Sequence, residues 1–350
     1  MTVATFTLRP GYEISRIICG GWQFSDGHSA VDRTTGVDTL AAYAEAGIFT
    51  FDCADIYTGV EELMGAMRAQ VERRHGAAAL ARIKVHTKCV PDLARLRDVD
   101  RTYIRAVAET SLKRLRTDRI DLVQFHWWDY SIPGAIEAAG WLAELQREGK
   151  IDRIGGTNFD TPHAAELTAA GIDLVSMQIQ YSLLDARPEH GMVDFCRANN
   201  VRLLCYGTVA GGFLSDRWLG VAEPRPPFEN RSLTKYKLII DDFGGWDLFQ
   251  ELLRALRAIA DRHATDIASV ASRAMLDRPM VAAVIVGARN RAHLAHNVGI
   301  TSFALTEADH TEIGKVLARR QGPHGDTFAL ERDRNGRHGS IMKYNLNQVA

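Results

Sequence analysis

The sequence predicts an α/β fold in which eight parallel strands close into a (β/α)8 TIM barrel. Eight short apolar runs alternate with amphipathic stretches, and several of these runs are apolar almost throughout. A strand that is covered on both faces has such a nearly continuous apolar pattern, and right-handed crossovers close eight βα units into a barrel. A doubly wound open sheet is the main alternative. It is disfavoured because no GxGxxG pattern follows the first apolar run.

The elements follow from the spacing of apolar residues. Helices are predicted over 39–46, 104–115, 136–146 and 247–260, because their apolar residues recur three and four positions apart. The stretch 220–233, with three prolines, is predicted to be an extended surface loop after the seventh strand. The irregular C-terminal tail, after Leu317, has few apolar residues and is expected to be extended or partly mobile. The strands are expected at 15–19, 48–52, 83–88, 120–125, 153–156, 174–178, 202–206 and 282–286.

Composition and length limit the class of protein. The 350 residues are expected to form one domain over 1–350, with a core at about 10–317 and a tail over 318–350. The 42 Lys and Arg residues nearly balance 43 Asp and Glu residues, so we expect no nucleic acid and no membrane as partner. The five cysteines form no CxxC pair, and neither a signal peptide nor a long apolar span is evident. A reducing, cytoplasmic location is the simplest expectation. Nothing in the sequence addresses the oligomeric state.

Polar residues with useful chemistry stand where the predicted strands end. In a barrel of this kind the reactive groups lie at the carboxyl ends of the strands. A single lysine or histidine at such a position is usually a paired or packed residue. The set is harder to dismiss, because four proton-active side chains converge on one mouth. In strand order from the second to the seventh, the residues are Asp52 with Tyr57, Lys88, His126, Thr157 with Asn158, Gln178, and Tyr206.

Longer phrases link these residues to a known family. They are DCADIYTGVEELMG, KVHTK, SLKRLRTDRIDLVQFHWWD, GKIDRIGGTNF, MQIQYSLLD and VIVGARNRAHLAHNV, spread over about residues 10–320. Together they resemble the aldo-keto reductase family. The resemblance implies a TIM barrel that transfers hydride between NADPH and a carbonyl carbon. It places the catalytic tetrad on Asp52, Tyr57, Lys88 and His126.

Elementary chemistry agrees with these four roles. Hydride that reaches a carbonyl carbon creates an alkoxide, so the oxygen needs a proton donor in place. A free tyrosine has a pKa of about 10, and the Lys88 ammonium would lower the pKa of Tyr57. Asp52 would keep Lys88 charged. His126 is expected to donate a hydrogen bond that orients the substrate oxygen.

The resemblance also implies a cofactor site. The nicotinamide carboxamide contacts fall on Thr157, Asn158 and Gln178, and the stacking ring on Tyr206. Gly207, Gly211 and Gly212 would let the backbone approach the pyrophosphate, although Gly207-Thr208-Val209 replaces the commoner Ser-Pro-Leu. The adenosine 2'-phosphate pocket falls on Gly287, Arg289, Arg291 and His293, with Asn297 at the adenine. His293 stands where many relatives have Arg, and His296 where they have an acid. The two arginines favour NADPH, and NADH remains possible.

The substrate is expected to be a small carbonyl compound or a sugar. Trp22, Trp127 and Trp128, together with Phe24 and Tyr130, could line an aromatic mouth that the tail closes; this tail carries His324, Asp326 and Arg334. Two alternatives use the same residues: a dehydrogenase working from alcohol to carbonyl, and a non-catalytic nucleotide-sensing partner subunit. A metal-dependent barrel hydrolase would use His86, Lys88, His126 and Asp129. No metal site is expected, because the sequence has no HxH pair or comparable ligand cluster at a strand end.

Overall fold

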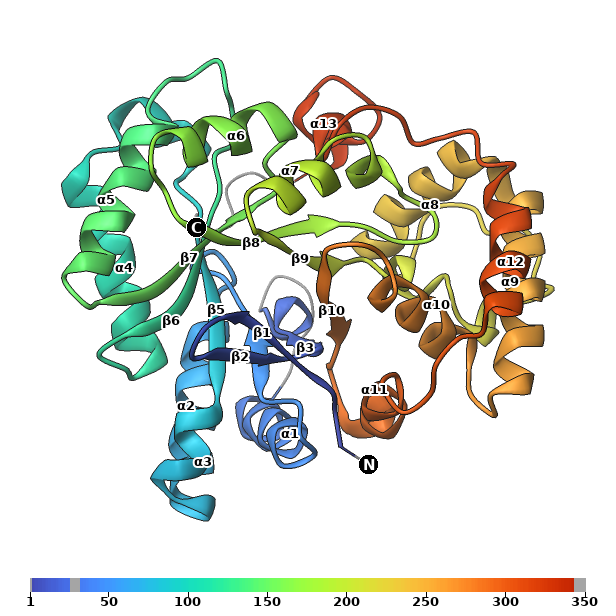
Figure 1. Ribbon diagram of the computed structural model, residues 1–350, viewed down its shortest axis with the longest axis horizontal. Coiled ribbons are helices and arrows are strands. Elements are labelled where there is room, and N and C mark those ends of the chain that lie inside the picture. The colour runs from blue at the N-terminus through green and yellow to red at the C-terminus, as the bar shows by residue number, and fades with distance from the viewer. Residues whose placement is uncertain (1, 26–31, 343–350) are drawn as a thin grey trace.

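The computed structural model describes residues 2–25 and 32–342, and its centre is a closed barrel of eight parallel strands (Figure 1). The strand order around the barrel is β10-β3-β4-β5-β6-β7-β8-β9. Each of the eight predicted strands overlaps one of these, so the predicted TIM barrel is confirmed. The strands are β3 (Ile17–Gly20), β4 (Thr50–Asp52), β5 (Lys84–Cys89), β6 (Ile120–Phe125), β7 (Ile151–Thr157), β8 (Leu174–Gln180), β9 (Arg202–Tyr206) and β10 (Val281–Gly287).

Helices surround the barrel (Figure 1). Several begin at a side chain that accepts a hydrogen bond from a backbone N–H of the first turn, as Asp100, Asn230 and Asp266 do. The four predicted helices correspond to α1, α4, α5 and α9. The helices are α1 (Arg33–Glu45), α2 (Val60–His75), α3 (Ala77–Arg82), α4 (Arg101–Leu115), α5 (Ala135–Arg147), α6 (Thr161–Ala169), α7 (Met192–Ala198), α8 (Arg231–Phe243), α9 (Gly245–Arg262), α10 (Ile267–Leu276), α11 (Leu294–Gly299), α12 (Glu307–Leu317) and α13 (Ala329–Arg332).

A hairpin that the sequence analysis missed closes one end of the barrel. Strands β1 (Thr5–Arg9) and β2 (Tyr12–Ser15) pair antiparallel before the first barrel strand. Leu8 and Tyr12 pack on side chains inside the barrel, and Arg9 donates to the carbonyl of Leu174, where β8 begins. The hairpin therefore covers the end at which the barrel strands start. The opposite end, where the strands finish, is left for the cavity described below.

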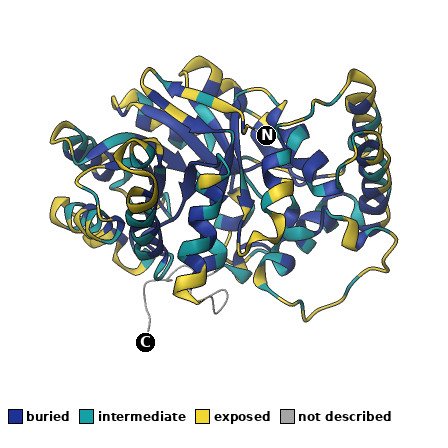
Figure 2. Cartoon of the chain, turned by 90° about the horizontal axis from the view of Figure 1, so that it is seen from below, coloured by how far each residue is buried: buried dark blue, intermediate teal, exposed yellow. Residues whose placement is uncertain are grey.

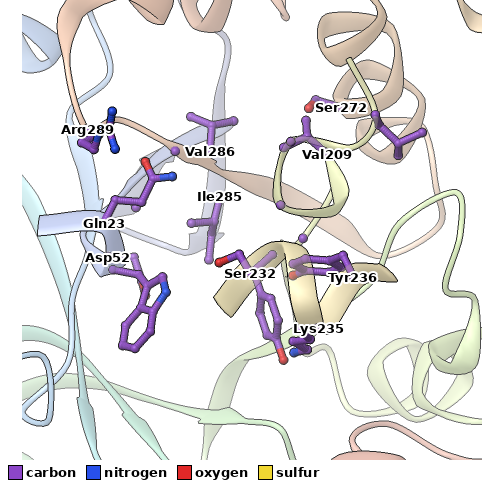
Figure 3. A pocket seen from close by; sticks show the side chains of 18 of the residues that line it. Gln23, Asp52, Val209, Ser232, Lys235, Tyr236, Ser272, Ile285, Val286 and Arg289 are labelled. Atoms are coloured by element: carbon purple, nitrogen blue, oxygen red, sulfur yellow. The ribbon is translucent and has the colours of Figure 1, made fainter. Parts of the chain in front are cut away.

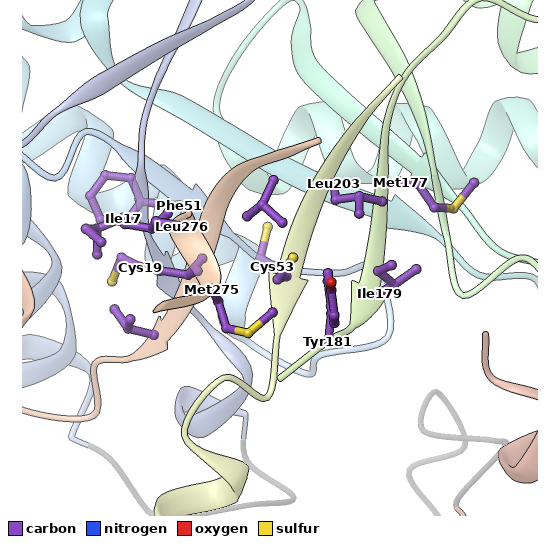
Figure 4. Packing of buried hydrophobic residues seen from close by; sticks show 14 of the residues in the cluster. Ile17, Cys19, Phe51, Cys53, Met177, Ile179, Tyr181, Leu203, Met275 and Leu276 are labelled. Carbon is purple, nitrogen blue, oxygen red and sulfur yellow. The ribbon is translucent and has the colours of Figure 1, made fainter. Parts of the chain in front are cut away.

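The main core lies between the barrel strands and the helices. Ile17, Phe51, Met177, Leu203 and Met275 are fully buried members of this core (Figure 4). Coloured by burial, the interior is almost entirely buried and exposed residues concentrate on the outer helical faces and loops (Figure 2). All five cysteines are buried and unpaired. The strands are therefore nearly all apolar because both of their faces are covered by other residues.

The two stretches predicted to be irregular differ from expectation in instructive ways. The predicted loop ends earlier, because the Asn230 side chain accepts from the N–H of Leu233 and starts α8 at Arg231. The tail is irregular, as predicted, but its part up to residue 342 is anchored rather than loose. Its Glu331 is fully buried against Arg187, at 2.8 Å and 3.1 Å. In the sequence, the charges of the tail indicate an extended or partly mobile chain, whereas Glu331 and Arg334 are paired with Arg187 and Asp129.

Candidate active site

A cavity of about 820 Å³ opens at the carboxyl ends of the barrel strands. Figure 3 shows Gln23, Asp52 and Arg289 on one side of it and Ser232, Lys235 and Tyr236 of α8 on the other. A cavity of this size suits an organic ligand that fills a deep cleft. The predicted residues that line it are Trp22, Asp52, Tyr57, Lys88, His126, Trp128, Thr157, Asn158, Gln178, Tyr206, Gly207, Gly211, Gly212, Gly287, Arg289, His293 and Asn297.

Lys88 is held at the end of β5 by three oxygen atoms. Its Nζ lies 2.9 and 2.8 Å from the two carboxylate oxygens of Asp52 and 2.8 Å from the carbonyl oxygen of Cys53. Burial is the largest single influence and lowers the pKa of Lys88, but the charge of Asp52, its hydrogen bond and the neighbouring Tyr57 together outweigh it, and the net pKa is raised. Lys88 is therefore an ammonium in a buried position, with a carboxylate as its counter-ion.

Tyr57 lies beside this ion pair. The Lys88 Nζ is 5.0 Å from the centroid of the Tyr57 ring, and the Trp22 ring lies next to Tyr57, with ring centroids 4.9 Å apart. Burial raises the pKa of Tyr57, and the Lys88 charge opposes that rise. The effect of Lys88 was predicted from the sequence, but burial has the larger effect on the pKa of Tyr57 in the structure. The net result is a phenol that keeps its proton, as a proton donor must.

Two glutamines support Asp52 from neighbouring strands. The Nε2 atoms of Gln124 and Gln178 donate to Oδ1 of Asp52 at 3.1 Å and 2.6 Å. The sequence analysis did not single out Gln124. Its position two residues before His126 on β6 was the available signal, because alternate residues of a strand share a face. Gln178 lines the cavity as expected, and in addition it orients the carboxylate.

His126 has a fixed hydrogen-bonding polarity. Its Nδ1 lies 2.9 Å from the carbonyl oxygen of Thr157, which can only accept, so Nδ1 carries the hydrogen. Burial lowers the pKa of His126 to about 3, and the positive charge of Arg332 adds to this effect. The imidazole is therefore neutral, and Nε2 is an acceptor. The expectation that His126 donates to the substrate oxygen does not fit this arrangement.

The residues predicted for the carboxamide lie together at the ends of β7, β8 and β9. The Tyr206 hydroxyl donates to Oδ1 of Asn158 at 2.8 Å, and the Thr157 hydroxyl donates to the carbonyl of Gln178 at 3.2 Å. Asn158 has a φ of 59°, a left-handed conformation that asparagine tolerates better than most residues. These bonds leave the Asn158 amide nitrogen as a donor beside the Tyr206 ring.

Next to this group, α8 begins at the cavity wall. Gly207 and Gly211 have φ values of 77° and 64°, and a Cβ on either would lie 2.3 Å or 2.7 Å from an atom of Tyr236. Both positions therefore require glycine. Arg231 and Ser232, in the first turn of α8, also line the cavity. The free N–H groups of a helix start attract phosphate. The sequence analysis missed these two residues, although Asn230 after the proline-rich loop signalled a helix start.

The far end of the cavity brings together Arg289, His293 and Asn297, with Asn297 donating to the hydroxyl of Tyr43 at 3.1 Å. Arg291 does not join them. Its Nη2 donates to the carbonyl of Asp38 in α1 at 2.8 Å, outside the cavity. Asn290 caps a short 3-10 helix that begins at Arg291, so Arg289 precedes this helix while Arg291 belongs to it.

The comparison with protein families decides the family. The profile described as Aldo/keto reductase family matches residues 16–318, most of the chain. This chain belongs to the aldo-keto reductase family. The resemblance in the sequence is thereby confirmed. Aldo-keto reductases are oxidoreductases that use nicotinamide cofactors and act on small carbonyl substrates.

Individual relatives of this aldo-keto reductase are distant. The aldo-keto reductase YhdN of Bacillus subtilis is 28% identical over 88% of this chain and 91% of its own length. An NADH-specific methylglyoxal reductase of Escherichia coli is 25% identical over 87% of this chain and 96% of its own. In structure, a glycerol dehydrogenase from Gluconobacter oxydans has a TM-score of 0.75, with 24% identity over 93% of this chain and 98% of its own. At that identity the likeness shows the shared fold.

The aromatic mouth of this aldo-keto reductase is smaller than predicted. Trp22 and Trp128 line the cavity, but Trp127 is wholly buried and its Nε1 donates to the carbonyl of Ile132 at 2.9 Å. Trp127 is therefore a packing residue, because its side chain points away from the mouth. Phe24 and Tyr130 do not line the cavity either.

The tail of this aldo-keto reductase reaches the mouth through apolar side chains. Phe328, Ile341 and Met342 line the cavity, and the Phe328 ring meets His126 edge-on with centroids 5.8 Å apart. The polar tail residues named from the sequence lie elsewhere. Arg334 pairs with Asp129, the Asp326 carboxylate accepts from Thr161, and His324 is exposed. Closure of the mouth by the tail is thus apolar.

The hydrolase alternative does not match this geometry. Within residues 2–25 and 32–342, no three His, Cys, Asp or Glu side chains are grouped to hold a metal ion. His86 is fully buried inside the barrel, and Asp129 is bonded to Ser131 and Arg334. Over the same residues, no helix has the length and apolar character needed to cross a membrane.

Proposed function

We propose that this chain is an NAD(P)H-dependent carbonyl reductase in which Tyr57 is the general acid. One observation supports this most: a neutral phenol lies against a buried ammonium, Lys88, which is itself neutralised by Asp52. Such a group gives up its proton only as negative charge develops on a bound oxygen. We propose a single catalytic domain that works in the cytoplasm. The five unpaired, buried cysteines support a reducing compartment.

The residues present fit a nicotinamide dinucleotide. Amide and hydroxyl groups of Thr157 and Asn158 suit a carboxamide, and the Tyr206 ring offers a stacking face. The glycines that approach α8 and the first turn of that helix form a cradle for phosphate. When bound, the reduced cofactor supplies the hydride. The protein's own task is to orient the substrate and to deliver the proton.

The arrangement of Tyr57, Lys88 and Asp52 at the strand ends explains how the proton is delivered. As hydride arrives, the carbonyl oxygen becomes an alkoxide and takes the proton from the Tyr57 hydroxyl. The phenolate that remains is stabilised by the Lys88 ammonium, whose charge already opposes the rise in the pKa of Tyr57. Asp52 keeps Lys88 charged, and Gln124 and Gln178 hold the carboxylate in place. Each group is positioned before the substrate enters.

The oxidative direction is a second candidate, and the polarity of His126 favours it. Because Nε2 accepts, it can receive a hydrogen bond from the O–H of an alcohol. In the reductive direction the same nitrogen would accept a hydrogen bond from a hydroxyl group on the carbon next to the carbonyl. Hydroxylated substrates therefore suit the site in both directions.

A pair of nearly isosteric ketones tests this polarity. Hydroxyacetone and 2-butanone differ by a hydroxyl in place of a methyl group beside the carbonyl carbon. We expect His126→Phe to lower the ratio of their kcat/KM values by about two- to tenfold relative to wild type, the range for one net hydrogen bond of 0.5–1.5 kcal/mol. Comparing the ratio between two proteins cancels the intrinsic reactivity of the ketones. An unchanged ratio would show that Nε2 does not receive the hydroxyl.

NADPH is the proposed cofactor, although one relative is described as NADH-specific. Arg289 lines the end of the cavity and is exposed, so its contact with a 2'-phosphate is worth the lower end of a charged hydrogen bond, about 1.5 kcal/mol. We therefore expect Arg289→Ala to raise the Kd of NADPH about tenfold and to leave the Kd of NADH unchanged. Titration of cofactor fluorescence measures both constants.

Arg291→Ala is the matched control, because Arg291 bonds the Asp38 carbonyl outside the cavity. It should change neither Kd. Equal affinity of the wild type for NADH and NADPH, or equal losses for both cofactors in Arg289→Ala, would refute the NADPH assignment. The hydride-transfer proposal would stand in either case.

The remaining alternative is a nucleotide-sensing partner subunit without turnover. The intact arrangement of Asp52, Tyr57 and Lys88 supports catalysis instead, because a sensor has no need of a buried ammonium beside a phenol. A screen of aldehydes, ketones and sugars with NADPH and NADH distinguishes the two. Cofactor binding without turnover of any carbonyl or alcohol would favour the sensor.

A further inference from the structure

We propose that Arg332, in the C-terminal segment, is a positioning residue that holds His126 and Asn158 in register with each other. The proposal rests on the proposed function, since it assigns a role toward the cofactor and the substrate. Arg332 lies in α13, and its partners precede it by 174 to 205 positions along the chain. Nothing in the local sequence around Arg332 indicates such a role.

The guanidinium of Arg332 binds two loops at once. Its Nη1 donates to the carbonyls of Trp127 and Trp128 at 2.6 Å and 2.7 Å, and its Nη2 donates to the carbonyl of Asn158 at 2.9 Å. Trp127 and Trp128 directly follow His126 after β6, while Asn158 directly follows β7. One planar group thus joins the two loops that carry the substrate-facing imidazole and the carboxamide-facing amide. A lysine has no such fork.

A stack on Tyr130 holds the guanidinium in place. Its carbon lies 3.8 Å from the centroid of the Tyr130 ring, and Nη2 also donates to the Tyr130 hydroxyl at 2.7 Å. Arginine on an aromatic face gains both cation–π attraction and planar packing. The donors of Arg332 therefore point in a defined direction, and this direction is toward the two loops.

Asn158 is the residue whose conformation most needs this support. Its φ of 59° lies in the left-handed region, and its side chain already accepts from Tyr206. The backbone N–H of Asn158 donates to the carbonyl of Gln178, and its carbonyl accepts from Arg332. Bonds on both sides of the residue fix the peptide plane. Without Arg332 the carbonyl loses that partner, and only the N–H bond to Gln178 then holds the peptide plane.

The rest of the segment is anchored independently of Arg332. Glu331, fully buried, pairs with Arg187 at 2.8 Å and lies 3.8 Å from Lys235 of α8. Phe328 packs edge-on against His126. A change at Arg332 therefore removes the link to the two loops while the segment keeps its place. The positioning role can be tested separately from the presence of the tail.

Arg332 also acts on the charge state of His126. Burial is the larger cause of the lowered pKa of His126, and the positive charge of Arg332 is the second. The other groups that face the imidazole are the Thr157 carbonyl and the uncharged rings of Trp128 and Phe328; Tyr57 and Lys88 also line the same cavity. Loss of the Arg332 charge should raise the pKa of His126. The imidazole would then gain a proton, and lose its acceptor, at a higher pH.

The experiment compares three variants of the full chain. Arg332→Met removes the fork and the charge, Arg332→Lys removes the fork and keeps the charge, and Arg334→Met is a matched control in the same segment, outside the cavity. We expect Arg332→Met to lower kcat/KM for the carbonyl by about 10- to 100-fold, since small misplacement of reacting groups costs up to about 100-fold. The loss of activity on acidification should begin at higher pH than in wild type. Arg332→Lys should lose activity on acidification at the same pH as wild type but should have a lower kcat/KM. Arg334→Met should match wild type in both the pH profile and kcat/KM.

Two further readouts separate this proposal from others. The Kd of the cofactor, titrated without substrate, should rise several-fold in both Arg332 variants and not in Arg334→Met. This binding measurement still tests the positioning role if the wild type turns over no carbonyl, which would refute the proposed function alone. Wild-type Kd, kcat/KM and pH profile in Arg332→Met would overturn the proposal. So would a loss of rate that matches a loss of folded protein, measured by thermal unfolding, with Kd and pH profile unchanged.

Discussion

Tyr57→Phe is expected to abolish most carbonyl reduction, with a loss of about 10²- to 10⁴-fold in kcat. Phenylalanine keeps the ring that packs on Trp22, with centroids 4.9 Å apart, and removes only the hydroxyl that donates the proton. The Kd of the cofactor should be nearly unchanged. Single-turnover measurement of cofactor oxidation reports the chemical step itself.

Tyr103→Phe is the matched control for this change. The Tyr103 hydroxyl accepts from the N–H of Asp92 beside α4, outside the cavity, so its removal should leave kcat at the wild-type value. If Tyr57→Phe retained near-normal single-turnover rates, Tyr57 would not be the acid, and another group in the cavity would have to supply the proton.

Lys88→Met is expected to have the second large effect, on rate and on stability together. It removes the ammonium that stabilises the Tyr57 phenolate, so kcat should fall by at least about 100-fold. It also leaves the buried Asp52 carboxylate without its counter-ion, which costs about 3–5 kcal/mol of unfolding free energy. Denaturant unfolding of the variant measures this cost.

Removing Lys88 should also shift the pH dependence of the activity, and the direction of this shift can be derived. For reduction Tyr57 must be protonated, so activity is present below the pKa of Tyr57 and is lost as pH rises through it. Burial raises that pKa and Lys88 opposes the rise. Without Lys88 the alkaline limb of the residual activity should therefore move to higher pH.

The double variant Asp52→Asn/Lys88→Met separates the two effects of Lys88. With both charges removed, much of the lost stability should return, because no unpaired ion remains buried. The activity should stay low. Recovery of activity together with stability would mean that Lys88 acts only through folding. An unaltered rate and pH profile in Lys88→Met alone would refute its electrostatic role.

Local patterns in the sequence were enough to predict the barrel and the polar residues that gather at one end of it. Buried parallel strands read as apolar runs, and residues that directly follow such runs, such as Lys88 and His126, must lie at the same mouth. The hairpin of β1 and β2 was missed because its strands are short and β2 is separated from β3 only by Arg16. A single residue between two strands does not change the pattern of apolar residues enough to reveal that there are two strands.

Side-chain direction and distant pairing were beyond what the sequence could predict. Trp127 and Trp128 are adjacent, yet only Trp128 faces the cavity, and Arg289 and Arg291 differ in the same way. Both outcomes depend on how a loop turns after its strand. Arg332 falls in the tail that was predicted to be extended or partly mobile, and its role was missed because its partners lie far from it in the chain.

The buried anchor at Glu331 has a consequence for how the protein is made. The barrel has all its strands once Gly287 has been synthesised, whereas Glu331 and Arg332 are among the last described residues to leave the ribosome. On the proposal for Arg332, a nascent or prematurely terminated chain can close its barrel and still lack an aligned site. Full enzyme activity would then appear only after Arg332 has been synthesised. Products truncated before Glu331 would then be much less active than the full chain.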